Sequence, residues 1–236
     1  MANYFSQFNR EFLFELPEGI QGNYMKIADA KEKYGDEVIE VMAREKKICR
    51  YLDIPFQHIS DNQLTLMKRR HTKAEALALV EKLRRAIPDI ALRTTLLVGY
   101  PGETEEDFAE LMEFVKTTKF DRLGVFPYSE EEGTYSATRL KDDVAEELKQ
   151  ERVERIMRLQ ERVSLENNAR RIGQTMRVIV DRKEGDFYIG RSEYDSPEVD
   201  QEIIIDSCGK RLLRGRFYDV KITDCEDYDL FAELIK

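Results

Sequence analysis

The stretch TTLLVGYPGETEEDFAELMEF, from Thr94 to Phe114, joins an apolar run to an amphipathic helix through a turn that holds two glycines and a proline. Thr104 is placed to cap that helix. Its apolar positions recur at helical spacing, at Phe108, Leu111, Met112 and Val115. A strand, a tight turn and a capped helix in this order predict one half of a parallel βαβ unit.

The turn itself has the features of a ligand-binding position. In parallel α/β folds, ligands bind at the carboxyl ends of the strands, where this turn is expected. Gly99 and Gly102 would allow the backbone to approach a ligand closely. The turn lacks both the GK[ST] of a phosphate loop and the GxGxxG of a dinucleotide fold, so nothing favours a nucleotide phosphate. Two interpretations stay open: a flat ring lying on the glycine backbone, or a purely structural turn.

Similar elements flank this stretch. Apolar runs at 50–56 and 120–128 predict two further strands, and Asp36 is placed to cap an early helix. A second helix begins at Thr72, which forms a capping box with Glu75. The order of strands and helices predicts a parallel α/β fold. Three strands are too few for a closed barrel of about eight, so they are expected to form part of one.

The pattern changes beyond residue 141. Residues 142–171 predict one long charged helix, interpreted as a solvated connector. Residues 172–236 alternate with period two in five short runs separated by Gly and Asp, which predicts a small five-stranded antiparallel OB-like barrel. The expected organisation is therefore α/β over 36–141, a connecting helix, and a barrel, with residues 1–35 unassigned.

The overall charge and the absence of apolar segments limit the possible environments. The chain has 236 residues and a formal net charge of −9, which does not attract phosphate backbones in general but would attract a basic protein. No apolar stretch reaches the roughly 20 residues that a membrane span needs, and the first residues have no signal-peptide pattern. A soluble, cytoplasmic protein without a membrane partner is expected.

Metal-binding residues are few. The three cysteines, Cys49, Cys208 and Cys225, are far apart, and no pair has metal-ligand or redox spacing. The only histidines are His58 and His71. The sequence therefore predicts no self-contained zinc or iron–sulfur site, and the cysteines are expected to be reduced thiols.

Four motifs resemble a known family. YLDIPFQHISD, IALRTTLLVGYPGETEEDF, FDRLGVFPYSEEEGT and IGQTMRVIVDRKEGDFYIGRSEYDSPEVD are similar to the methylthiotransferases of the radical S-adenosylmethionine superfamily, over roughly 200 residues. The likeness is greater to the group that methylthiolates an aspartate of the twelfth small-subunit ribosomal protein than to the tRNA-modifying group. It implies a partial radical-SAM (β/α) barrel followed by a TRAM domain, and S-adenosylmethionine with two 4Fe–4S clusters in the whole enzyme.

The resemblance also implies roles for nine residues. They are the candidates for binding S-adenosylmethionine: Gln57, His58, Arg93, Thr95, Gly99, Gly102, Glu105, Phe126 and Tyr128. Gly99, Gly102 and Glu105 match the GxxGxxE element beside the adenine, and Arg93 is a candidate partner for the methionyl carboxylate. The alternatives are a buried structural imidazole at His58, a core ion pair at Arg93, and packing for the pair Phe126 and Tyr128.

The chain also departs from the family. It has neither the CxxxCxxC motif of the catalytic cluster nor the cysteines of a second cluster domain. Without thiolate ligands nothing would hold the iron, so no metal ligand and no catalytic residue is proposed from the sequence. The chain is expected to correspond to the C-terminal part of such an enzyme and to be inactive alone.

The identity of the partner separates two hypotheses. As part of a methylthiotransferase, the chain would bind the basic twelfth small-subunit ribosomal protein; the alternatives are a tRNA-modifying enzyme or a non-catalytic module that binds ribosomal protein or RNA. Residues 170–236 contain 12 basic and 15 acidic residues, net −3, which favours a basic protein over tRNA. The candidate contact is an acidic segment containing Glu193, Asp195, Glu198 and Asp200, for which a solvated loop is the alternative.

Overall fold

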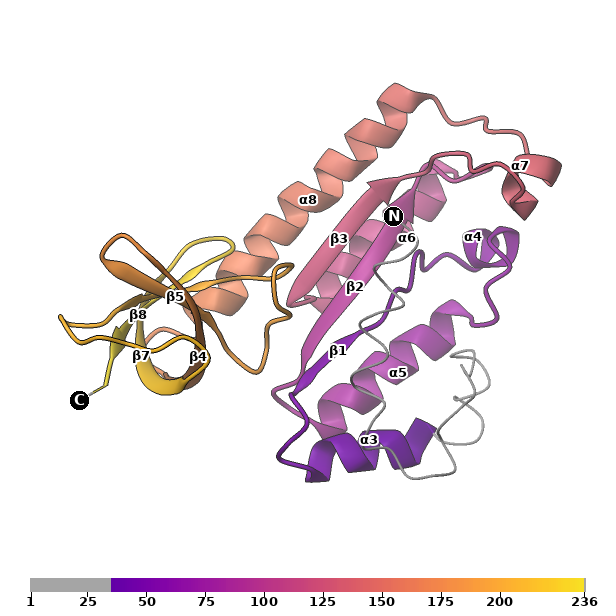
Figure 1. The fold of residues 1–236 in the computed structure, drawn as a ribbon. Helices are drawn as coiled ribbons and strands as arrows, with labels where there is room; N and C mark the ends of the chain where they lie inside the picture. Colours follow the sequence, from indigo (N-terminus) through magenta and orange to yellow (C-terminus); the bar gives the residue numbers. More distant parts are fainter. Residues whose placement is uncertain (1–34, 236) are drawn as a thin grey trace. The chain divides into compact units, whose positions relative to one another are not determined.

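The computed structural model describes residues 35–235 (Figure 1). The unassigned segment 1–34 lies outside the described residues. From Ile39 onward the described elements belong to one compact unit. The α/β part contains α3 (Gly35–Arg44), β1 (Tyr51–Asp53), α4 (Asp61–Leu66), α5 (Lys73–Ala86), β2 (Ala91–Val98), α6 (Glu105–Thr118), β3 (Arg122–Pro127), α7 (Tyr135–Arg139) and α8 (Glu146–Ala169).

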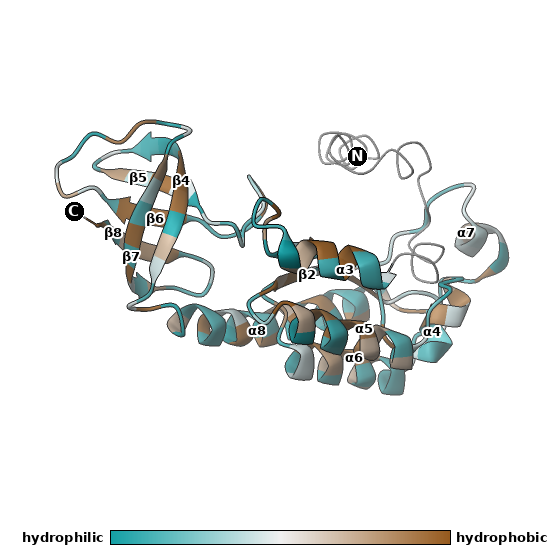
Figure 2. Cartoon of the chain, turned by 90° about the horizontal axis from the view of Figure 1, so that it is seen from below, coloured by the Kyte–Doolittle hydropathy of each residue, from teal (hydrophilic) through white to brown (hydrophobic). Residues whose placement is uncertain are grey.

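A three-stranded parallel sheet, in the order β1-β2-β3, forms the frame of this part. The parallel α/β prediction is therefore confirmed. Figure 2 shows α5, α6 and α8 on one side of β2. Alternate residues of β2 point toward these helices and are buried: Thr94, Leu96 and Val98. The residues between them are only partly buried and lie on the other face of the sheet.

Two of the three predicted caps are present, and the third was wrong, because Asp36 lies inside the first turn of α3 and does not precede it. The Thr72 side chain accepts a hydrogen bond from the Glu75 backbone N–H, and the Glu75 carboxylate accepts one from the Thr72 N–H. Thr104 forms the equivalent box with Asp107 at the start of α6. Because each cap satisfies backbone donors that the first helical turn leaves unpaired, the sequence specifies where both helices begin.

The long helix α8 lies between the two parts in the sequence, but one of its faces is buried, contrary to the solvated helix that its charge suggests. It packs against β3 and α6. Ile156 is fully buried in its contact face, together with the long polar side chains of Arg152 and Gln160. Gln160 donates a hydrogen bond to the carbonyl of Phe120, 2.9 Å away, just before β3. The helix therefore belongs to the helical layer that covers the sheet.

The C-terminal part is a closed barrel of five strands. They are β4 (Thr175–Glu184), β5 (Phe187–Arg191), β6 (Ile203–Asp206), β7 (Phe217–Cys225) and β8 (Leu230–Leu234), in the order β4-β5-β6-β8-β7. The five-stranded barrel is confirmed, but its description as antiparallel needs a correction. β6 and β8 run parallel, because β8 inserts between β6 and β7 to close the barrel.

Apolar side chains that alternate along the strands fill this barrel, among them Val178, Ile203, Ile205 and Val220. Gly190 in β5 is required by packing, because a Cβ there would lie 2.4 Å from the carbonyl oxygen of Ile179. Among the residues that the structure describes, no helix has both the length and the apolar character needed to cross a membrane.

Candidate functional site

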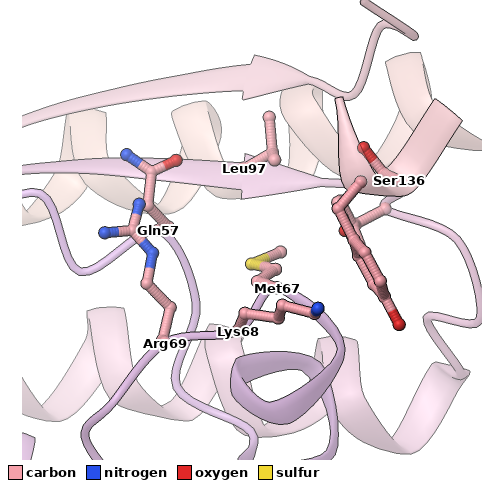
Figure 3. A pocket seen from close by; sticks show the side chains of 8 residues that line it. Gln57, Met67, Lys68, Arg69, Leu97 and Ser136 are labelled. Atoms are coloured by element: carbon pink, nitrogen blue, oxygen red, sulfur yellow. The ribbon is translucent and has the colours of Figure 1, made fainter. Parts of the chain in front are cut away.

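A cavity of about 290 Å³ lies at the carboxyl end of β2 (Figure 3). This is the edge of a parallel sheet where ligands bind. Its volume is at the lower limit of small-molecule pockets, so it would accommodate part of a larger ligand. Its walls come from the segment after β1, the end of β2, the residues after α4, the glycine turn and α7: Gln57, Met67, Lys68, Arg69, Leu97, Tyr100, Tyr135 and Ser136.

Gln57 has an unusual backbone conformation. Its φ is +67°, in the left-handed region that residues with a side chain rarely occupy. Pairing with β2 holds it there: the Gln57 N–H donates to the Thr95 carbonyl at 2.9 Å, and its own carbonyl accepts from the Leu97 N–H at 2.7 Å. Figure 3 shows its side chain at the cavity. Backbone strain held in place by its surroundings is typical of functional positions.

Two adjacent cations make the cavity basic. Lys68 has a φ of +54°, and its Nζ lies 3.4 Å from the centroid of the Tyr135 ring. In the part of the chain that the structure describes, no carboxylate pairs with Arg69, whose side chain also lines the cavity. A guanidinium beside a cavity, without an anionic partner, is suited to binding a carboxylate or phosphate.

The glycine turn contributes one aromatic side chain to this cavity. Tyr100 lies between Gly99, with φ +70°, and Gly102, with φ +78°. Its ring packs edge-on against Tyr128, with 5.0 Å between the centroids, and its hydroxyl is 3.4 Å from the Leu66 carbonyl. Burial raises the pKa of the Tyr100 phenol. The turn therefore presents a neutral aromatic ring to a ligand at neutral pH.

His58 is buried away from the cavity. Its Nδ1 accepts a hydrogen bond from the Ser60 N–H at 3.0 Å, so the ring proton is on Nε2. That Nε2 lies 3.5 Å from Oε1 of Glu103, and both side chains are fully buried. This geometry fits the alternative of a structural imidazole.

Arg93, Thr95 and Phe126 share the sheet face that α5, α6 and α8 do not cover. The Arg93 guanidinium is occupied there by Asp53 at 2.5 Å and Asp200 at 3.4 Å. Burial opposes its charge, but these two carboxylates outweigh burial and raise its pKa.

The other candidates lie outside the cavity. Phe126 is 57% exposed, whereas Tyr128 is buried in packing with Tyr100. Glu105 points toward α8, where it meets Arg152 at 3.4 Å and Arg155 at 3.2 Å. Of the nine residues named from the sequence, the cavity wall includes only Gln57.

The acidic segment has two kinds of carboxylate. Asp195 is buried in an ion pair with Arg122 of β3, with 2.5 Å between Oδ1 and Nη2, and Asp200 pairs with Arg93. Glu193 and Glu198 are exposed. Only the second two are free to contact a partner, so a role for all four would require the first two to leave their ion pairs.

The described residues do not fit an iron–sulfur cluster. Among residues 35–235, no three His, Cys, Asp or Glu side chains are grouped so that they could hold a metal ion. Cys49 and Cys208 are exposed and Cys225 is partly exposed, each as a free thiol. Partial desolvation, with the nearby Glu193 carboxylate, raises the pKa of the Cys49 thiol, which opposes the thiolate form that metals bind.

Sequence reasoning missed most of the cavity wall, although one signal was present. Met67 to Arg70 reads MKRR, a run of three cations in an acidic chain, immediately before the capping box at Thr72. Such a run between two helices marks a basic loop. Tyr135 and Ser136 gave no comparable signal, because α7 is a single short helix in a polar segment.

Comparisons with known proteins agree with this geometry. Residues 20–115 match the model of the Radical SAM superfamily, and residues 172–235 match that of the TRAM domain. A ribosomal protein uS12 methylthiotransferase RimO from Bacteroides thetaiotaomicron is 51% identical over 199 residues, covering 84% of this chain and 46% of the relative. The same enzyme from Christiangramia forsetii is 52% identical over 197 residues, covering 84% and 44%.

A likeness to one solved structure is weaker. The radical SAM enzyme coproporphyrinogen III oxidase from Escherichia coli aligns with 18% identity and a TM-score of 0.39, over 61% of this chain and 41% of that one. The chain spans a little less than half of the length of the uS12 methylthiotransferases that it matches.

The parallel α/β part and the barrel therefore define a partial radical SAM protein with a C-terminal TRAM domain. Within that class, the chain is a homologue of the ribosomal protein uS12 methylthiotransferases named RimO.

Proposed function

We propose that the chain forms the S-adenosylmethionine-binding and partner-binding part of a uS12 methylthiotransferase, which adds a methylthio group to an aspartate of that ribosomal protein. The observation that carries this proposal is the identity of about half of the residues over 84% of the chain. In such an enzyme S-adenosylmethionine supplies the radical that activates the substrate carbon. The ribosomal substrate would place the protein in the cytoplasm.

The cavity supports a binding role for four of its side chains. Tyr100 would contact the adenine ring, and Gln57 would donate or accept a hydrogen bond at the cavity wall. Arg69 replaces Arg93 as the residue proposed to bind the methionyl carboxylate, because Arg93 already has two carboxylate partners. Lys68 adds positive charge beside it. The iron–sulfur clusters have no ligand set among the described residues.

Calorimetric titration with S-adenosylmethionine tests this assignment. The chain should bind weakly, because its described residues offer no ligand set for a cluster that would add to the affinity. Arg69→Met should weaken binding about tenfold or more, the loss of one charge-assisted pair. Arg158→Met, an exposed cation on α8, is the control and should bind like the parent. Equal affinities of the parent and Arg69→Met would contradict the role of Arg69.

For the partner, we propose that the exposed carboxylates Glu193 and Glu198 contact the basic uS12 protein. The double change Glu193→Gln with Glu198→Gln should weaken that complex and reduce its dependence on salt, because complementary charge mainly accelerates association. Glu130→Gln with Glu132→Gln, exposed after β3, removes the same charge elsewhere and should have little effect. Titration with uS12 and with tRNA at two salt concentrations makes the comparison. Tighter binding to tRNA would favour the tRNA-modifying alternative.

A second candidate function, RNA binding by the barrel, is favoured by one specific observation. A pocket of about 380 Å³ on the barrel is lined by Lys183, Arg211 and Arg214 together with Tyr188. Its one carboxylate, Asp181, pairs with Arg191. Lys183 lies over the Tyr188 ring at 5.5 Å, and within the described residues neither Arg211 nor Arg214 has a carboxylate partner. Cations interleaved with aromatic rings are typical of surfaces that bind single-stranded RNA.

The net charge of −3 therefore does not describe this face of the barrel. If RNA binds there, Arg211→Glu with Arg214→Glu should abolish binding of a single-stranded oligonucleotide, measured by fluorescence anisotropy. The charge-matched control is Arg158→Glu with Arg162→Glu on α8, which should retain binding. If the oligonucleotide binds neither the parent chain nor the control, the barrel does not bind RNA, and uS12 is the partner that remains.

A further inference from the structure

The carboxylate of Glu103 lies at the centre of the glycine turn and is completely buried. Its Oε2 accepts a hydrogen bond from the backbone N–H of Gly99. The same oxygen lies 3.3 Å from Nη1 of Arg152, which α8 contributes. A buried carboxylate is costly unless it is paired. Here Oε2 has one amide of the turn and one guanidinium as partners, and Oε1 faces Nε2 of His58 at 3.5 Å.

Arg152 joins this carboxylate to the start of α6. The side chain is 2% exposed, and Nη1 is also 3.4 Å from the backbone carbonyl of Glu103. Nη2 reaches the Glu105 carboxylate at 3.4 Å, while the guanidinium lies over the Phe108 ring at 5.1 Å. One guanidinium from α8 therefore contacts two successive carboxylates after the turn. Its planar fork makes this possible where a lysine would provide a single point contact.

The segment before α8 forms a hydrogen bond with the second glycine of the turn, Gly102. Asp143 accepts a hydrogen bond from the Gly102 N–H at 2.8 Å. The methylene groups of Lys149 cover Gly99 so closely that a Cβ on Gly99 would lie 2.3 Å from Lys149 Cγ. Both glycine N–H groups are thus donated to carboxylates of the protein. Residues of α8 and of the segment before it therefore contact the turn on the side away from the cavity. On the cavity side, the turn contributes the Tyr100 ring.

We propose that Glu103 and Arg152 are positioning residues that fix the glycine turn and, through it, the Tyr100 ring in the cavity. Neither lines the cavity, so both act through the turn. For the ligand, the inference rests on the proposed function. It gives α8 a role at the cofactor site in addition to its place in the helical layer, because the guanidinium that completes the pair comes from this helix.

Two double variants separate the effect of the hydrogen bond between Gly99 and Glu103 from the effect of the buried charges. Arg152→Met with Glu103→Gln removes both charges but keeps an acceptor for the Gly99 N–H. Arg152→Met with Glu103→Leu removes both charges and the acceptor. We expect the Gly99 amide hydrogen to exchange at least tenfold faster in the second double variant than in the first, and the Tyr100 ring protons to shift only in the second. The Leu97 amide, bonded to Gln57, should exchange equally in both.

A variant that should not disturb the fold extends the test to Gly102. Asp143 is exposed, so Asp143→Ala should leave the fold intact while the Gly102 amide exchanges faster. Glu147→Ala, which removes another exposed carboxylate at the start of α8, is its control. Equal exchange of Gly99 in the two double variants, with unmoved Tyr100 signals, overturns the inference. The same holds if Asp143→Ala leaves the exchange at Gly102 unchanged.

Titration with S-adenosylmethionine separates this inference from the proposed function. If the parent chain binds, the variant with Glu103→Leu should bind at least tenfold more weakly than the variant with Glu103→Gln, and equal affinity overturns the effect on the cofactor. If the parent chain does not bind, the proposed cofactor site fails, while the exchange rates and ring signals still decide whether Glu103 and Arg152 position the turn.

Discussion

Gly99 occupies a position where any side chain would meet two obstacles. Its φ of +70° is unfavourable for residues with a Cβ, and that Cβ would collide with Lys149. Gly99→Ala should therefore lower the free energy of unfolding by about 2 to 4 kcal/mol, combining backbone strain and overpacking. Gly133→Ala is the control, because its φ is +81° but no atom lies near the added methyl, so about 1 kcal/mol is expected. Urea titration measures both, and equal losses would contradict the collision.

The Asp107 carboxylate makes the free energy of unfolding depend on pH. Burial opposes its charge, but hydrogen bonds from Ser60, Thr104 and Asn62 outweigh burial and lower its pKa to about 2. A depressed pKa stabilises the folded state above the unfolded value of 3.8, and that contribution is lost as the pH falls toward 2. It should amount to about 2 kcal/mol at most.

The matching variant is Asp107→Asn, which should be less stable than the parent at pH 6. The difference between the two should shrink as the pH falls from 4 to 2, because the parent carboxylate becomes protonated. Urea titrations at several pH values provide the measurement. A difference that stays constant down to pH 2 would show that the charge of Asp107 contributes nothing.

At the scale of single elements, the two capping boxes differ in their surroundings. Thr72 and Glu75 are exposed, whereas Asp107 of the second box is buried and also bonded to Ser60. Thr72→Ala should cost about 1 kcal/mol of unfolding free energy, the usual value for a lost cap. Thr104→Ala should cost about 2 kcal/mol, because it also leaves a buried carboxylate short of donors. The reverse order of the two losses would refute this account.

The elements that the sequence predicted are those with local signals. The capping box at Thr72, the cap at Thr104, the apolar run of β2 and the period-two strands are properties of neighbouring residues, and each led to the correct element. The face of α8 was missed because Arg152 and Gln160 are polar by type and are buried only through contacts with distant segments. The parallel pairing of β6 with β8 was missed because alternation along a strand does not specify the direction of its neighbour.

The candidate site was predictable in its location but not in its residues. The glycine turn correctly marked the carboxyl end of β2. The wall opposite the turn comes from the basic loop after α4 and from α7, which the chain brings to the cavity only through the tertiary fold. Arg93 shows the converse difficulty, because its partners Asp53 and Asp200 are distant in the sequence and favour the alternative of an ion pair over a ligand contact.

At the scale of the whole molecule, the ion pair between Arg122 and Asp195 joins the parallel sheet to the loop between β5 and β6. Both side chains are at least nine-tenths buried, and Asp195 also accepts hydrogen bonds from the Ser192 N–H and hydroxyl. Arg122→Met leaves a buried carboxylate unpaired, so it should lower the unfolding free energy by about 3 kcal/mol.

The comparison for this pair is Arg182→Met on the barrel surface. Arg182 bonds Glu202 through two nitrogens, but the pair is exposed and should contribute about 1 kcal/mol or less. Denaturant titration of both variants measures the two losses of unfolding free energy. Similar losses would mean that the buried pair is no stronger than a surface one.

The insertion of β8 between β6 and β7 determines when the barrel can form during protein synthesis. Until Leu230–Leu234 has left the ribosome, β6 and β7 each have an unpaired edge, and the apolar residues Ile203 and Ile205 lack their neighbour on that side. The nascent chain can pair β4 with β5 early, since they are joined by a short turn. Closure must wait for translation of the fifth strand, so ribosome pausing before residue 230 would prolong an aggregation-prone intermediate.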